Sequence, residues 1–286
     1  MFSIKDKRLQ WGLGLAAAGA LGVLLDSFFL EKYFFAVKTF DLGKPTGGKT
    51  LQLLHLTDLH LQKRLHPQHR KLAAKINQLQ PDLLLFSGDT LDSSGHVAAV
   101  EQFLGLIAPQ IRKVAIPGNH DYLAADPVAE LKATFERHNG HFLVNQSQAF
   151  TLRGVRVMVT GLDDFVESEG NLEKAVQNVG HEPHHLLLLH SPLQQEETKA
   201  ALTKINQRRA PAERLNIQYI FAGHNHGGQI RLPGYVPVLP KKSGSYVQGW
   251  YNTQAPFLYL SRGFGTSRIP FRFFARAEIT LFRYHV

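Results

Sequence analysis

The chain has 286 residues, of which 44% are hydrophobic and 19% charged, a composition that excludes intrinsic disorder and suits one large α/β domain or two small ones. Its 32 Lys and Arg against 23 Asp and Glu give a net charge of +9. This balance favours an anionic partner: a phosphorylated substrate, an acidic lipid surface or nucleic acid. Nucleic acid is not expected, because the basic residues do not cluster with aromatic ones that would stack on bases. The absence of cysteine excludes disulfides, thiolate metal ligands and a cysteine nucleophile.

The chain begins with a basic segment, 1–10, followed by an apolar stretch, 11–30. About 20 apolar helical residues span a bilayer core at about 1.5 Å per residue. Trp11 and Tyr33 stand near the two ends of the stretch, where membrane interfaces favour aromatic rings. We therefore predict an uncleaved membrane anchor; a cleaved signal peptide and a soluble core helix are the alternatives. Lysines on both sides prevent the charge bias from selecting a face of the membrane.

Residues 31–50, with the Pro- and Gly-rich segment 44–49, are interpreted as a linker into one domain over 51–286. In that domain the apolar patterns of strands and helices alternate. Strands are expected up to Thr57 and over 83–86, 114–116, 186–189 and 219–222, and helices over about 67–79, 96–107, 127–138 and 172–179. Residues 142–160 suggest paired strands, and the aromatic-rich C-terminal part suggests more. The alternation predicts an α/β fold with two sheets packed face to face.

Polar residues of the kinds that bind metals stand at the ends of the apolar runs. The first run, from Leu53, ends in Asp58 and His60. Strand side chains two positions apart leave on the same face, so this carboxylate and imidazole can converge on one cation. A single Asp-His pair is more often an aspartate in a turn beside a surface histidine. A metal site is indicated only because similar residues recur at the ends of later apolar runs. The later runs end in Asp89, in Asn119-His120-Asp121, in His190, and in His224 and His226.

Oxygen donors mixed with imidazoles, without thiolates, indicate a site for Mn, Fe, Zn or a similar divalent ion. The five blocks occur in the order Asp-x-His, Gly-Asp, Gly-Asn-His-Asp, a lone His and Gly-His-x-His. In this the sequence resembles the calcineurin-like metallophosphoesterases. The resemblance implies a four-layer αββα sandwich of two mixed sheets, which would follow the N-terminal transmembrane helix. It also implies two divalent ions, with Mn²⁺ as the first choice and Fe or Zn as alternatives.

The resemblance further implies a role for each block. One metal would be held by Asp58, His60 and His226, the other by Asn119, His190 and His224, and Asp89 would bridge them. Two cations joined in this way clamp a phosphate and activate water. His120 would steady the phosphoryl oxygens or protonate the leaving group, and Asp121 would either fix the tautomer of His120 or cap the helix expected after Pro127.

Other acidic and imidazole side chains are assigned differently. Asp163 and Asp164 occupy the place of a Gly-x-Asp-Asp loop often found near the site in this family, but they are not counted as ligands. His55, in the middle of a strand, is expected in the core or directly behind the ligands. His69 and His185 are expected on the surface or in loops.

Two C-terminal segments narrow the resemblance to a bacterial branch that joins an N-terminal membrane segment to the phosphoesterase domain. They are Gly227-Gly228-Gln229 and the run 258–273, although Ala277-Glu278 replaces the usual Pro-Glu. Some members look like UDP-2,3-diacylglucosamine pyrophosphohydrolases of lipid A synthesis, and others like general phosphodiesterases. The expected location is the inner membrane, and the expected partners are the membrane and a phosphorylated small-molecule or lipid substrate. A tethered binding protein without chemistry is the non-enzymatic alternative, although none of the expected ligands is missing.

Overall fold

The computed structural model describes residues 7–45, 47–232 and 234–286, and in them two six-stranded sheets are packed face to face. The first sheet consists, in spatial order, of β1 (Ala36–Leu42), β12 (Glu278–His285), β2 (Thr50–Leu56), β3 (Leu83–Ser87), β4 (Lys113–Ile116) and β5 (Gly140–Phe142). The second consists of β10 (Gly249–Tyr251), β11 (Phe257–Leu260), β9 (Ile217–Ala222), β8 (His185–Leu188), β7 (Val155–Gly161) and β6 (Gln146–Leu152).

Both sheets are mixed, as predicted. In the first, β2 to β5 run parallel, while β12 is antiparallel to β2. In the second, β7, β8, β9 and β11 run parallel and the edge strands β6 and β10 are antiparallel to their neighbours. Parallel neighbours deliver their carboxyl ends to one edge, so the polar residues after β2, β3 and β4 lie together.

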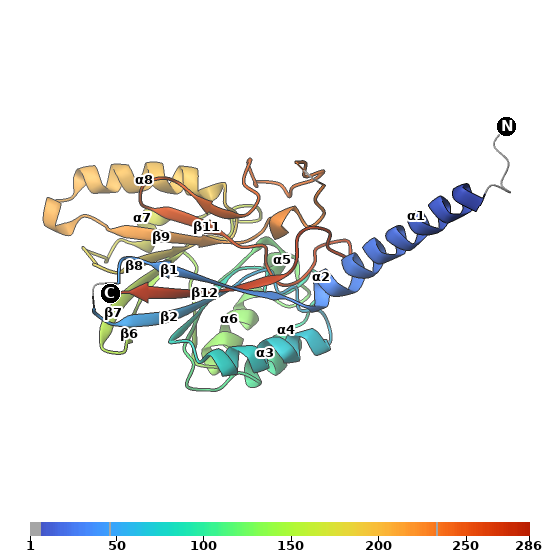
Figure 1. Cartoon of the computed structure of the whole chain (residues 1–286). Coiled ribbons are helices and arrows are strands. Elements are labelled where there is room, and N and C mark those ends of the chain that lie inside the picture. The colour runs from blue at the N-terminus through green and yellow to red at the C-terminus, as the bar shows by residue number, and fades with distance from the viewer. Residues whose placement is uncertain (1–6, 46, 233) are drawn as a thin grey trace.

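Helices cover the outer faces of the two sheets and complete the four layers (Figure 1). They are α3 (Pro67–Leu79), α4 (Val97–Gly105) and α6 (Val128–Arg137) on the first sheet, and α7 (Leu172–Ala175) and α8 (Gln194–Arg208) on the second. Short helical turns are α5 (Asn119–Leu123), η2 (Pro211–Glu213) and η3 (His226–Gly228).

Successive side chains of β2 point to opposite faces of the first sheet and show how the layers are built. Leu54 packs toward α3 and α4, whereas Leu53 packs between the sheets. Both side chains are fully buried, because a strand of this sheet has apolar layers on both faces. The continuous apolar runs of the sequence are thus explained by burial on two sides.

The N-terminal helix α1 (Lys7–Leu25) continues through the π-helical turn η1 (Asp26–Leu30) into α2 (Glu31–Tyr33). Residues Gln10–Leu30 form a helical segment long and apolar enough to cross a membrane, and almost none of its apolar stretch is buried against the rest of the protein. Figure 1 shows α1 projecting away from the sandwich at the end opposite the C-terminus. An N-terminal apolar helix is therefore confirmed as a candidate membrane span.

The structure differs from the expected elements in several places. Residues 31–50 are not simply a linker, because β1 pairs along its whole length with β12. The paired strands expected within 142–160 are confirmed as β6 and β7, whereas β5 joins the first sheet and α8 was not expected. His69 and His185, expected on the surface or in loops, are buried.

Candidate metal centre

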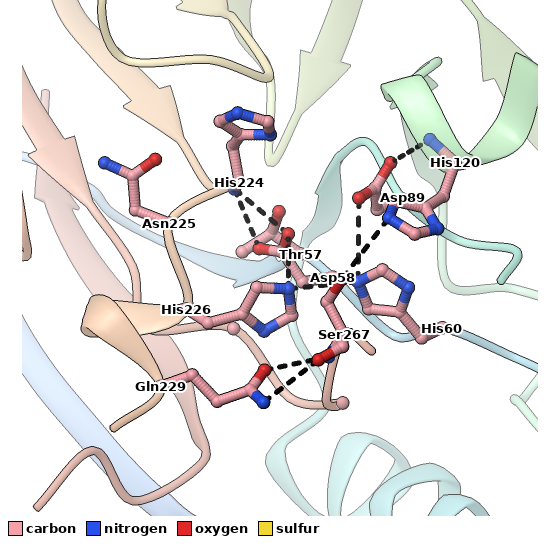
Figure 2. A network of polar contacts seen from close by, with 12 residues as sticks. Thr57, Asp58, His60, Asp89, His120, His224, Asn225, His226, Gln229 and Ser267 are labelled. Atoms are coloured by element: carbon pink, nitrogen blue, oxygen red, sulfur yellow. Dashed lines mark hydrogen bonds and ion pairs between the residues drawn. The ribbon is translucent and has the colours of Figure 1, made fainter. Parts of the chain in front are cut away.

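The predicted ligands come together where the strands of both sheets end. Asp58 and His60 follow β2, Asp89 follows β3, and Asn119 opens α5 after β4; His190 follows β8, while His224 and His226 follow β9. Figure 2 shows Asp58, His60, Asp89, His120, His224 and His226 surrounding one small space. Apart from Asn119 and His120, which are partly exposed, these side chains are buried.

One half of the cluster is formed by His60, His226 and Asp58. His60 Nε2 lies 3.0 Å from His226 Nε2, and His226 Nε2 lies 3.5 Å from Asp58 Oδ1. The three ligand atoms are close enough to bind a single ion. This is the set predicted for the first metal.

The other half is centred on His190. Its Nε2 lies 3.2 Å from Asn119 Oδ1 and 3.3 Å from His224 Nδ1. Asp89 connects the halves, because Oδ1 lies 3.3 Å from His190 Nε2 and Oδ2 lies 3.5 Å from His60 Nε2. One oxygen toward each group is what a bridging carboxylate requires.

Backbone carbonyls fix which imidazole nitrogen faces the centre. His190 Nδ1 lies 2.8 Å from Ser87 O, and His224 Nε2 lies 2.7 Å from Lys241 O. Since carbonyls only accept, each of these nitrogens carries a proton, so His190 Nε2 and His224 Nδ1 are the nitrogens left to face the centre and to bind a metal, which displaces any proton there. The residues present therefore fit a divalent metal.

The backbone at these positions is unusual. Asp58, His60, Asp89, His224 and His226 all have φ between 46° and 76°. Non-glycine residues rarely adopt this left-handed region, and each such residue costs of order 1 kcal/mol or more. Five ligands in this conformation indicate that the chain is held in strain to aim their side chains.

The backbone of segment 258–273 passes so close to Asp58 that it requires a glycine at position 263. Gly263 has a φ of +67°, and a Cβ placed there would lie 2.7 Å from Asp58 Oδ2. Only glycine lets this loop pass behind the carboxylate without displacing it.

The buried carboxylates make the centre attractive to positive charge. Burial works against a charged imidazole at His190, but the Asp89 carboxylate outweighs it and raises the pKa of His190 to about 10. Burial also opposes ionisation of Asp89, yet the nearby His190 holds the pKa of this carboxyl below its usual range. The negative charge of these carboxylates would favour bound metal cations in the same way.

His120 and Asp121 have different surroundings. The His120 ring meets His60 edge-on with centroids 4.6 Å apart, and its Nε2 lies 3.3 Å from Ser267 Oγ. The Asp121 carboxylate instead accepts the backbone N–H groups of Gly118, at 2.8 Å, and Leu91, at 2.7 Å. It thus fixes the loop that carries His120, and the helix it caps is α5, not the one expected after Pro127.

Sequence reasoning missed several neighbours of the cluster. Asp92 Oδ2 lies 3.6 Å from His60 Nδ1, and its place three residues after Asp89 was the only signal. Gln229 and Ser267 exchange two hydrogen bonds, Ser267 N to Gln229 Oε1 and Gln229 Nε2 to Ser267 O. Asp163 accepts the Tyr122 hydroxyl at 2.5 Å and so braces α5.

Comparisons with known proteins agree with this geometry. Residues 51–228 match the calcineurin-like phosphoesterase family. The uncharacterized metallophosphoesterase YkuE of Bacillus subtilis is 30% identical over 288 residues, covering 96% of this chain and 95% of its own. A transmembrane protein with metallophosphoesterase domain from Danio rerio is 27% identical over 82% of this chain and 53% of its own.

Among solved structures, a 5'-nucleotidase from Candida albicans matches 76% of this chain with a TM-score of 0.46 and 16% identity. This chain spans about half the length of that protein, with 47% of it covered. Family match, relatives and ligand cluster together lead to one conclusion: the chain belongs to the calcineurin-like phosphoesterases and is a metal-dependent phosphoester hydrolase.

Proposed function

We propose that the protein is a dimetal phosphoesterase that hydrolyses a phosphodiester or pyrophosphate bond while α1 holds it in a membrane. The observation that carries the proposal is the placement of Asp89, whose two carboxylate oxygens lie 3.3 and 3.5 Å from the imidazoles of separate ligand groups. In this role Asp89 would bridge two ions. Asp58, His60 and His226 would hold one, and Asn119, His190 and His224 would hold the other.

Two divalent ions bound there supply Lewis acidity and an activated water. The protein's own contribution is orientation. His120 stands at the partly exposed side of the cluster, next to Ser267, so its Nε2 is placed to contact phosphoryl oxygens or to protonate the leaving oxygen. Mn²⁺ is our proposal for the native ion, since carboxylate, amide and imidazole donors suit it.

For the substrate we propose UDP-2,3-diacylglucosamine, cleaved to UMP and 2,3-diacylglucosamine 1-phosphate at the inner membrane. The apolar N-terminal helix and the net charge of +9 support it, because they suit a substrate with acyl chains and a diphosphate. The relative in Danio rerio, named as a transmembrane protein, pairs a membrane segment with the same domain. The alternative function is that of a general phosphodiesterase of the cell envelope, which would act on other substrates.

The test is turnover by detergent-purified protein, stripped of metal and reloaded with Mn²⁺. Asp89→Asn should bind less metal by elemental analysis and lose at least about a hundredfold in turnover, since removing one strong electrostatic contact at a reacting centre costs that much. Unchanged metal content and activity in this variant would contradict the dimetal proposal.

The same assay separates the two substrates. Rapid release of UMP from UDP-2,3-diacylglucosamine, with little hydrolysis of an unacylated phosphodiester, is the expected result. The reverse preference would identify a general phosphodiesterase. Asp41→Asn, at an exposed carboxylate on β1, is the matched control.

A further inference from the structure

The end of the N-terminal helix is bonded to a loop of the catalytic domain. Arg272 N donates to Ser27 O at 3.1 Å, and Ala275 N donates to Glu31 Oε2 at 2.9 Å. The rings of Phe28 and Phe271 pack with centroids 4.9 Å apart. The helix therefore leaves the domain at a fixed place, beside residues 271–275.

The same loop reaches the metal cluster. The buried guanidinium of Arg272 donates to Gly265 O at 2.9 Å and to Ala275 O at 2.8 Å, and its Nη2 lies 3.2 Å from His226 Nδ1. Phe273 pairs with the segment after η3, because Phe273 N donates to Gln229 O. The helix end and the site are thus joined through one short stretch of chain.

The segment after η3 and the loop 267–276, joined by the hydrogen bond from Arg231 N to Phe273 O, expose large apolar side chains, which we name the rim: Leu232, Tyr235, Val238, Ile269 and Phe274. Val238 is 75% exposed, Tyr235 60% and Phe274 59%. Isolated exposed apolar residues are normal, but a group beside an apolar helix end is a sign of an interaction surface.

The charge of segment 229–277 has one sign, and its negative neighbour is Asp26 at the helix end, whose Oδ1 lies 4.0 Å from Arg276 Nη2. Residues 229–277 contain no Asp or Glu, while the basic residues in them are Arg231, Lys241, Lys242, Arg262, Arg268, Arg272 and Arg276. Arg268 and Arg276 are exposed beside the rim. Apolar side chains interspersed with cations match the headgroup region of an anionic bilayer.

We propose that the rim is a second membrane contact that seats the mouth of the site on an anionic lipid surface. The proposal rests on the membrane anchor of the proposed function, and it deepens that function by stating how a lipid substrate reaches the site. A substrate would approach with its apolar part still in the bilayer and its phosphate directed to His120 and the metal ligands. Figure 1 shows α1 and α5, which carries His120, at the same end of the sandwich.

The absence of cysteine makes a clean test possible in the full chain. Single cysteines would replace Val238, Phe274, Leu15 within the helix, and the exposed Lys204 on α8 as a control. Each would carry a nitroxide, and the protein would be placed in vesicles of phosphatidylcholine with phosphatidylglycerol. Collision with oxygen, which concentrates in lipid, is then compared with collision with a water-soluble nickel chelate.

We expect the labels at Val238 and Phe274 to be clearly less accessible to nickel than the label at Lys204, although more accessible than the label at Leu15. Omitting phosphatidylglycerol or raising the salt should reduce the protection of the rim but not of Leu15, because only the rim contact includes screened surface charge. Rim labels as accessible to nickel as the label at Lys204, with Leu15 protected, would overturn the rim proposal alone. An accessible Leu15 would instead overturn the anchor on which it rests.

Discussion

At the scale of single residues, burial changes the chemistry of histidines that take no part in the metal cluster. His185 is fully buried at the start of β8, with its Nε2 2.7 Å from Thr160 Oγ1. Burial lowers the pKa of His185 to about 4. His55 is buried on β2 as expected, 2.7 Å from Ser87 Oγ, and burial lowers its pKa to about 3.

This predicts a loss of stability in mild acid. Below pH 6.5 the unfolded chain takes up a proton at His185, which the folded chain does not accept until the pH approaches 4. The free energy of unfolding therefore falls across that window, by about 3 kcal/mol for this residue at pH 4. His185→Gln should narrow the difference between the melting temperatures at pH 7 and pH 5, measured in detergent.

His141→Gln, at an exposed ring on β5, serves as the control and should leave that difference as it is in the native protein. If both variants changed the difference between the two melting temperatures equally, burial of His185 would not be the cause of the acid sensitivity.

At the scale of elements, β1 shows what the sequence could not reveal. Its side chains are alternately half-buried and exposed, and it pairs with β12, more than 200 residues away. The sequence around residues 36–42 does not indicate which distant strand they pair with. The helix α8 was missed for a related reason, since only Gln194, Gln195, Thr198 and Ile205 of it are buried and its sequence lacks a strong apolar stripe.

The convergence of the predicted ligands could be foreseen, because strand ends in the sequence remain strand ends in the fold. His190 directly follows an apolar run, and Asp58 and Asp89 stand within three residues of the end of one. Asp92 and the carbonyl of Lys241 were not predictable, because their contacts depend on how loops return to the site. Asp121 was half predictable: its capping role was foreseen, but the element it caps is α5.

A substitution in β1 tests whether this strand belongs to the domain. Leu42 is 2% exposed and packs between the sheets. Leu42→Ala should lower the free energy of unfolding by about 2 to 5 kcal/mol, through lost burial and the cavity left behind. Thermal melting of the purified protein measures the change.

Val37→Ala on the same strand is the matched control, since Val37 is 38% exposed and its truncation should cost much less. If Leu42→Ala melted at the native temperature, residues 36–42 would act as a linker in solution.

At the scale of the whole molecule, the cluster joins the two sheets. Asp58, His60, Asp89 and Asn119 follow strands of the first sheet, and His190, His224 and His226 follow strands of the second. A ligand that binds only the folded chain stabilises it by mass action. Metal should therefore stabilise the sandwich as a unit, not one half of it.

We expect Mn²⁺ to raise the melting temperature of metal-stripped protein by several degrees. At a thousandfold excess over Kd the stabilisation is about 4 kcal/mol. Asp89→Asn should lose most of this shift, whereas Asp41→Asn should retain it. A shift of the same size in Asp89→Asn would mean that the ion binds elsewhere.

The contribution of both sheets to the centre also links the metals to the packing of the interior. Between the sheets, the rings of Phe221 on β9 and Phe282 on β12 pack with centroids 4.7 Å apart. Aromatic rings of this size resist compression, and they help to fix the separation of the two layers. That separation sets how far the imidazoles of His190 and His224 stand from the carboxylates opposite them. Selectivity among divalent ions of different radius is thus expected to depend on the thickness of the sandwich as well as on the identity of the ligands.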